Sequence, residues 1–475
     1  MSCHVGQMIR IDVLPDDVLL EVFDFYVDMS LSYGGKKGTE AWQSLVHVCR
    51  RWRYLVLGSP RYLNLQLWCT PKTPAKDTLD IWPALPLVVR GTLSSGADNV
   101  IAALEQSNRV REVILRGLAG WQLEKVLAPM QVPFPELTEL QLSSLDESPP
   151  VIPDSFLDGS APRLRVFTLD AVPFPGLPKL LLASTHLVDL GLFDIPHSGY
   201  FSPQAMVALL SVLSSLEKLS IHFRSPQSRP DWERRSLPPL KCFVIPALYQ
   251  FHFTGVTEYL EDLVTHIDAP QLDDMHITFF NQIDFNCRRL AQFINRTPTL
   301  RALDEAHVQF YNSTASVNLR YRTSKFGLNN LLIYISCGEP DWQLSFIEQV
   351  CNSSLHPLST VEDLYIERQY SKLVWNNDAI ENTLWLQLLL SFTAAKNLFL
   401  SKEFAPDITA TLQELVRGRI TEVLPSLQNI FVEGLRAEPS GPLQENIGQL
   451  IAARQLSDHP ITISDWDKDS CMESI

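Results

Sequence analysis

The chain has 475 residues, of which 45% are hydrophobic and 20% are charged, and its formal net charge is −15 at pH 7. This hydrophobic content can bury a large core, which excludes a globally disordered chain. The excess of acidic residues argues against nucleic acids and anionic membranes as partners, because both attract surplus Lys and Arg.

Residues 1–18 lack the apolar stretch of a secretory signal. No apolar run approaches the ~18 residues that a membrane span needs. The eight cysteines are scattered and form no CxxC pair, which indicates reduced thiols in a chain without an export signal. We therefore expect the protein in the cytoplasm, the nucleus or both.

After an N-terminal extension of residues 1–10, residues 11–68 are predicted to form a helical module. The segment Leu14-Pro15-Asp16-Asp17 favours a helix start, because proline fits the first turn and the acids complement the helix dipole. Apolar residues then follow at helical spacing: Val18, Leu19, Val22, Phe23 and Tyr26. A second helical pattern runs over residues 41–56 and stops at Gly58-Ser59-Pro60.

Two segments of this module, LPDDVLLEVF (14–23) and VCRRWRYLV (48–56), resemble the F-box family in order and spacing. That family begins with Leu-Pro-x-Glu before a helix of aliphatics and an aromatic, and later carries Cys/Ser-Lys/Arg-x-Trp-Arg. The chain departs from it at Asp17, where the family often has Glu, and in the longer stretch 28–40 between the helices.

The resemblance implies that the module docks on the Skp adaptor of Skp–cullin–F-box ubiquitin ligases. F-box modules dock through apolar side chains of these helices, which makes the candidates Leu14, Pro15, Val18, Leu19, Val22, Phe23, Val48 and Trp52. The alternative is that the same apolar stripe packs internally and caps the following repeats.

From Val110 onward one pattern recurs: an aliphatic residue, two residues, an aliphatic, one residue, an aliphatic. The clear copies are LTELQL (137–142), LRVFTL (164–169), LVDLGL (187–192), LEKLSI (216–221), LDDMHI (272–277), VEDLYI (361–366) and LQNIFV (427–432). The weaker ones are VREVIL (110–115), LKCFVI (240–245), LRALDE (300–305), LNNLLI (328–333) and AKNLFL (395–400). This period predicts leucine-rich repeats, with one strand each and a return along a helix or loop.

The connecting segments support this interpretation. Apolar faces predict helices over 100–110, 202–216, 287–300, 382–392 and 442–457. Segment 83–90 is predicted to be the first strand of the array, segment 461–464 the last strand, and residues 466–475 an acidic tail. The expected fold class is therefore α/β: an F-box-like helical module, then an irregular leucine-rich-repeat solenoid over 69–465 with a parallel sheet on its concave face. This pairing resembles the F-box families of mushroom-forming fungi.

A candidate target-binding patch follows from the alternation of side chains along a strand. The first, fourth and sixth positions of each copy face the core, and the fifth faces outward. In the C-terminal copies the fifth position is large and apolar: Leu332, Tyr365, Phe399 and Phe431. Exposed aromatics in a row are typical of an interface. The alternatives are that a loop or the C-terminal segment near Trp466 covers them, or that the register is shifted by one.

Loop 223–239, which carries Arg224, Trp232 and further arginines among prolines, is a second candidate. Arginine forks bind acidic or phosphorylated segments, although a solvated insertion is the simpler interpretation.

No motif supports catalysis, since the chain has neither G-x-S-x-G nor H-E-x-x-H and its glycine-rich stretch 34–39 does not fit a phosphate loop. The eleven histidines are scattered singly, and those in or beside strand-like copies, such as His222, His276 and His307, are expected to be structural. We therefore expect no enzyme, no cofactor and no metal. The sequence favours a substrate receptor that binds a Skp adaptor, and through it a cullin ligase, and holds an unknown target protein on its solenoid. The alternative is a repeat scaffold that is not linked to a ubiquitin ligase.

Overall fold

The structure is a computed structural model that describes residues 11–32, 41–93, 97–226, 242–282, 285–322, 330–339, 342–352, 355–369, 382–414, 422–435, 442–456 and 459–467. The chain divides into two compact units, Met1–Leu164 and Arg165–Ile475. The predicted extension 1–10, most of loop 223–239 with Trp232, and the tail beyond residue 467 lie outside the described residues. The predicted module boundary at residue 68 stays a prediction.

Unit 1 begins with helices α1 (Asp16–Ser32), α2 (Ala41–Val46) and α3 (Arg50–Gly58). Helix α1 starts directly behind Pro15, with two aspartates in its first turn as the helix dipole favours. Helix α3 starts at Cys49, whose Sγ accepts the Trp52 backbone N–H at 3.5 Å. The Phe23 ring on α1 packs 4.7 Å from the Trp52 ring on α3. The two predicted helical segments therefore pack into one small module.

The rest of unit 1 is a parallel sheet with helices between its strands. The strands pair in chain order: β1 (Leu67–Cys69), β2 (Leu87–Thr92), β3 (Val110–Leu118) and β4 (Glu139–Ser144). The helices are α4 (Ala75–Ile81), α5 (Ala97–Leu104) and α6 (Gly120–Leu127). Trp42 of α2 connects the module to this sheet, since it donates to the Gln66 carbonyl at 3.1 Å and packs on Trp82.

Unit 2 continues the same architecture with twelve strands in its main sheet. In spatial order they are β5 (Val166–Asp170), β6 (Asp189–Ile195), β7 (Lys218–Phe223), β9 (Gln250–Gly255), β11 (Asp274–Phe279), β14 (Leu331–Ser336), β13 (Thr314–Arg320), β12 (Glu305–Phe310), β15 (Asp363–Arg368), β16 (Asn397–Leu400), β17 (Asn429–Glu433) and β18 (Thr462–Trp466). All adjacent pairs are parallel except those that involve β13, which runs antiparallel to β12 and β14.

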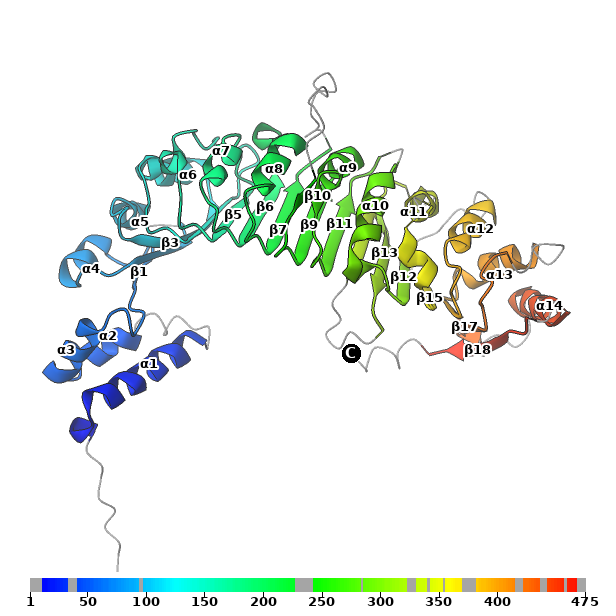
Figure 1. Ribbon diagram of the computed structural model, residues 1–475, viewed down its shortest axis with the longest axis horizontal. Coiled ribbons are helices and arrows are strands. Elements are labelled where there is room, and N and C mark those ends of the chain that lie inside the picture. The colour runs from blue at the N-terminus through cyan, green and yellow to red at the C-terminus, as the bar shows by residue number, and fades with distance from the viewer. Residues whose placement is uncertain are drawn as a thin grey trace, which may run out of the picture. The chain divides into compact units, whose positions relative to one another are not determined.

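The helices of unit 2 lie on one face of this sheet (Figure 1). They are α7 (Leu177–Leu182), α8 (Pro203–Leu210), α9 (Thr257–Val264), α10 (Arg288–Arg296), α11 (Gln343–Cys351), α12 (Asn382–Leu390), α13 (Ala405–Glu414) and α14 (Pro442–Leu456). The core lies between sheet and helices and contains the alternate strand residues, as in β7, β9 and β11. Among the described residues, no helix is both long enough and apolar enough to cross a membrane.

The predicted repeat pattern places most strands correctly. In the copies 137–142, 164–169, 187–192, 216–221, 272–277, 361–366, 395–400 and 427–432, the strand begins at the third position. The expected α/β fold with a long sheet is therefore confirmed, but the sheet is mostly rather than wholly parallel, because β13 runs antiparallel to its neighbours. This repetition of strand and helix gives the chain its leucine-rich-repeat-like character.

Two weaker copies were misplaced. Segment 240–245 contributes only the short strand β8 (Phe243–Val244), which pairs with β10 (Ile267–Asp268) outside the main sheet. The main sheet takes β9 instead, whose core positions are occupied by Phe251 and Phe253, and aromatic residues did not fit the aliphatic pattern.

The second misplaced copy is 300–305. Leu300 ends the 3-10 turn Pro298–Leu300, and the strand β12 begins only at Glu305. The hairpin of β12 and β13 that follows was not predicted. It inserts one antiparallel strand, so that β14 returns to pair with β11 while β12 pairs with β15.

Candidate functional site

The face of the unit 2 sheet opposite the helices carries the third, fifth and seventh positions of each repeat, and we call it the open face. On strands β7, β9 and β11 these positions are half-buried, while the alternate positions are fully buried. The predicted alternation of side chains is therefore present. Two features of the open face lie next to each other near its C-terminal end: a buried charged cluster and a row of stacked rings.

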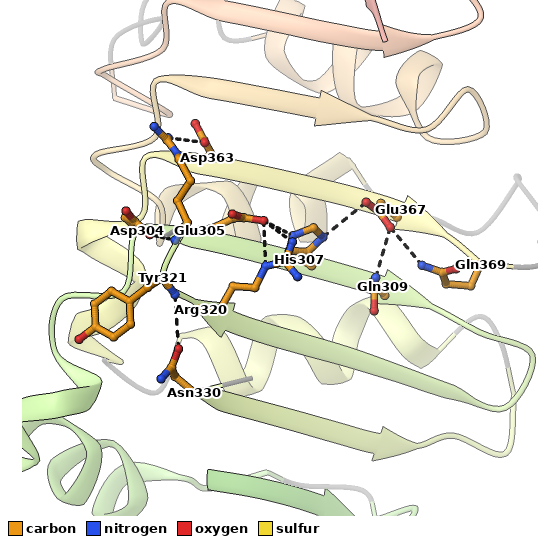
Figure 2. Close-up of polar contacts among 11 residues, drawn as sticks. Asp304, Glu305, His307, Gln309, Arg320, Tyr321, Asn330, Asp363, Glu367 and Gln369 are labelled. Carbon is orange, nitrogen blue, oxygen red and sulfur yellow. Dashed lines mark hydrogen bonds and ion pairs between the residues drawn. The ribbon is translucent and has the colours of Figure 1, made fainter. Parts of the chain in front are cut away.

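The charged cluster, which we call the His307 cluster, consists of Glu305, His307, Arg320, Asp363 and Glu367 (Figure 2). His307 lies on β12 with Nε2 at 2.6 Å from Glu305 and Nδ1 at 3.4 Å from Glu367. Arg320, the register partner of Glu305 on β13, donates from Nη2 to the same Glu305 oxygen at 2.6 Å. All three carboxylate side chains are less than one tenth exposed.

The charges in this cluster shift the protonation of its members. Burial opposes protonation of His307, but its contacts with Glu305 and Glu367 outweigh burial and raise the pKa of the imidazole. Burial likewise opposes ionisation of Glu305, but hydrogen bonds from His307 and Arg320 lower the pKa of its carboxyl group. The cluster is therefore a set of compensated charges, as buried ionisable groups require.

A polar ladder extends from the cluster across the last strands. Asn397 donates to Asp363 at 2.6 Å, and Asn429 donates to Asn397 at 2.7 Å. Thr462 of β18 donates to Asn429 at 2.5 Å, and Arg322 pairs with Asp363 from the other side. This row of hydrogen bonds at equivalent positions holds the register of β15, β16, β17 and β18.

The row of rings lies two residues further along the same strands, on the same face, and we call it the aromatic row. Tyr365 stacks on His307 with centroids 4.3 Å apart, Phe399 stacks on Tyr365 at 4.1 Å, and Phe431 stacks on Phe399 at 4.5 Å. The rings are within 10° of parallel in each pair. Trp466 of β18 packs against Tyr365 and Phe399 and is 6% exposed.

These positions decide which of the predicted patch residues remain accessible. Tyr365, Phe399 and Phe431 lie side by side on neighbouring strands, but they are half-buried rather than exposed. Leu332 does not belong with them: it is only 5% exposed, because its strand β14 lies between β11 and the inserted β13, with His276 and Asn318 as register partners. Trp466 partly covers the row, as the alternative interpretation anticipated.

A second surface lies on the helical module of unit 1. Leu19 and Phe23 of α1 are fully buried and form its inner face. Val18, Val22 and Phe25 recur at helical spacing beside them and are 38%, 44% and 67% exposed. We call these three residues the outer stripe. The apolar face of α1 is thus wider than the part that the module itself covers.

The predicted adaptor-binding residues divide accordingly. Leu19 and Phe23 are buried in the module and offer no surface, and Phe23 packs on Trp52 of α3. Pro15, Val18, Val22 and Val48 are exposed, and Leu14 and Trp52 are half-buried. The sequence pattern could not separate the inner from the outer apolar residues of α1, nor did it include Phe25.

The structure also shows where two other features considered in the sequence analysis lie: Arg224 of loop 223–239, and histidines such as His276. Arg224, at the start of loop 223–239, pairs with Asp194 at 2.8 Å, and the remaining arginines of this loop lie outside the described residues. We expected no metal site. However, three side chains that could bind a metal ion, His252, Asp274 and His276, lie close together elsewhere on the open face.

The His307 cluster was missed by the sequence analysis. Its residues come from β12, β13 and β15, which are up to 62 residues apart between Glu305 and Glu367. The available signal was the pattern Glu305-x-His307-x-Gln309, three polar residues at alternate positions on one strand, which places them on one face.

Comparison with known proteins gives little further guidance. No family model and no curated protein matches the chain. Among solved structures, the chain is similar to the leucine-rich repeat-containing protein LegL7 from Legionella pneumophila, with 14% identity and a TM-score of 0.24. The match covers 81% of this chain and 97% of that protein. We therefore base the functional argument on the two surfaces themselves.

Proposed function

We propose that the chain is a non-catalytic adaptor, with the helical module docking on a Skp-type adaptor of a cullin ubiquitin ligase and the open face of unit 2 holding a target protein. The outer stripe of α1 carries this proposal. Val18, Val22 and Phe25 are large apolar side chains left in solvent on a helix whose inner face is already packed. Apolar residues gathered in this way on a surface mark an interaction site.

The resemblance to F-box modules supports a Skp-type adaptor as the partner of this stripe. The two matching segments contribute Pro15, Val18, Val22 and Val48, which are all exposed. Arg51 of α3 holds the start of α1, since it donates to Asp16 and to the Leu14 carbonyl at 2.5 Å each. The docking helix is thus anchored at its N-terminus before any partner binds, which reduces the entropic cost of association.

The open face of unit 2 supports the second half of the proposal. Its aromatic row is held rigid by stacking and by the polar ladder beside it, and rigid aromatic side chains contribute most of the energy in many interfaces. Tyr365, Phe399 and Phe431 remain half-buried, so part of each ring is available to a bound protein. We propose them as contacts to the target.

The test is co-purification of the full chain with a Skp-type adaptor, comparing wild type with Val22→Asp. We expect a stoichiometric complex for wild type and loss of the complex for the variant, because a carboxylate would have to be buried without a partner in the interface. Val22 is exposed, so the variant should keep its stability to within about 0.5 kcal/mol. Trp52→Ala is a less clean variant, since Trp52 also packs on Phe23.

The matched control is Val212→Asp, the same change at a residue of unit 2 that is 37% exposed. It should leave the complex intact. If the wild-type chain is folded and forms no complex, the ligase role is wrong and the chain is a repeat scaffold without a link to a ubiquitin ligase. The inward packing of Leu19 and Phe23, which a simple helical cap would also need, is the observation that favours this alternative.

A further inference from the structure

His252, Asp274 and His276 bring two imidazoles and a carboxylate together on the open face of unit 2. His252 lies on β9, and its register partner on the neighbouring strand β11 is His276. Asp274 precedes His276 by two residues on β11, so it points to the same face of the sheet. The sequence predicted a structural role for His276 as one of several singly scattered histidines, but strand pairing makes it a neighbour of His252.

The donor atoms of the three side chains point toward one another. One Asp274 oxygen, Oδ2, lies 3.4 Å from His252 Nε2, and the other, Oδ1, lies 3.0 Å from His276 Nε2. All three donors lie within 4.8 Å of one another. Asp274 Oδ1 and His276 Nε2 are shielded from solvent, and neither makes a hydrogen bond of normal geometry. The two atoms are therefore in contact with each other without a well-directed hydrogen bond.

We propose that His252, Asp274 and His276 form a binding site for one divalent transition-metal ion of the zinc type. Two imidazole nitrogens with one carboxylate oxygen suit Zn²⁺ and similar ions, whereas Ca²⁺ and Mg²⁺ take oxygen donors. Bonds to zinc are about 2.0–2.2 Å long, so two donors on one ion lie no more than about 4 Å apart. The imidazoles are stacked with centroids 4.5 Å apart, and tilting of the rings brings their nitrogens within that range.

The surroundings fit such a site. The side-chain nitrogen of Gln250 donates to Asp274 Oδ2 at 2.8 Å and lies 3.1 Å from His252 Nε2, so it helps to hold both side chains in place.

The three side chains are 24%, 21% and 34% exposed. An ion can therefore enter from the open face. With three ligands from the chain, a zinc ion keeps a fourth position, which faces solvent and takes a water molecule or a donor side chain of a bound protein.

The proposal is tested by titrating the full chain, freed of metal by chelation, with ZnCl₂ in a calorimeter and with Co²⁺ in a spectrophotometer. We expect one zinc ion per chain and the visible absorption of tetrahedrally bound Co²⁺. Asp274→Asn and His276→Asn should each weaken zinc binding by more than about tenfold, since loss of an outer partner alone costs that much.

The matched control is His222→Asn. His222 lies on the adjacent strand β7 and packs on Phe193, outside the group of three, so its loss should leave zinc binding unchanged. Circular dichroism establishes that each variant is folded, and either ligand variant alone decides the result. The proposal is wrong if the folded wild-type chain takes up no zinc, or if both ligand variants bind it as the wild type does. The measurement uses no partner protein, so its outcome is independent of the adaptor role.

Discussion

At the scale of single residues, His307 shows how a histidine becomes part of a charged network. Glutamates approach both of its ring nitrogens, and Tyr365 stacks on its ring at 4.3 Å. Arg320 shares Glu305 with it, so each carboxylate has a cationic partner. Removing the histidine would take the imidazolium away from the buried Glu367, which also accepts hydrogen bonds from the neutral amides of Gln309 and Gln369.

The pKa of His307 is raised in the folded state. Protonation of His307 therefore stabilises the folded protein. The stabilisation is fully present below pH 6.5, the ordinary imidazole value, and is lost as the pH rises through the higher folded value. We expect His307→Gln to lower the free energy of unfolding by about 3 kcal/mol at pH 6 and by less at higher pH, because a buried charged pair is broken.

The measurement is urea denaturation of wild type and variant at pH 6 and at pH 8. His222→Gln is the control, since burial and the nearby His252 lower the pKa of His222 to about 4 and it is neutral throughout this range. A difference between wild type and His307→Gln that does not shrink from pH 6 to pH 8 would contradict the assigned charge.

At the scale of elements, the last strand β18 completes both the polar ladder and the aromatic row. It pairs with β17 along its whole length, and its Trp466 packs on rings two and three strands away. The indole Nε1 of Trp466 is buried and has no hydrogen-bond partner among the described residues. The packing of the Trp466 side chain therefore has to outweigh the free-energy cost of leaving this N–H group without a hydrogen bond.

We expect Trp466→Ala to lower the free energy of unfolding of the C-terminal repeats by about 3 kcal/mol, since a buried tryptophan leaves a large cavity. Trp342→Ala, the same change at a residue that is 51% exposed, should cost less than about 0.5 kcal/mol. Hydrogen exchange of β16 and β17 is the measurement, because it reports local opening. Equal exchange in the two variants would show that Trp466 does not hold these strands.

Most elements that the sequence predicted have an aliphatic residue at each core position, as in the copies 137–142 and 427–432. Strand β9 was missed because Phe251 and Phe253 replace the aliphatics. The hairpin of β12 and β13 was missed because polar residues occupy every second position of its strands. In addition, an inserted antiparallel strand gives no signal in the spacing of the repeats. Side-chain clusters such as the one at His307 depend on strand pairing, which a single sequence does not contain.

At the scale of the whole molecule, each unit carries one candidate surface. Unit 1 has the outer stripe of α1, and unit 2 has the open face with its aromatic row. An adaptor needs two such surfaces, because it acts by holding one protein near another and supplies no reacting group. The repeat architecture was predictable from the period, and the module from two short motifs. The division of α1 into an inner and an outer apolar face required the structure.

The most direct test of the adaptor role is to mix the purified chain with a purified Skp-type adaptor and measure the mass of the product by light scattering. The proposal predicts a complex with one copy of each protein that persists through gel filtration. Separate elution of the two proteins, with the chain folded by circular dichroism, would contradict the adaptor role.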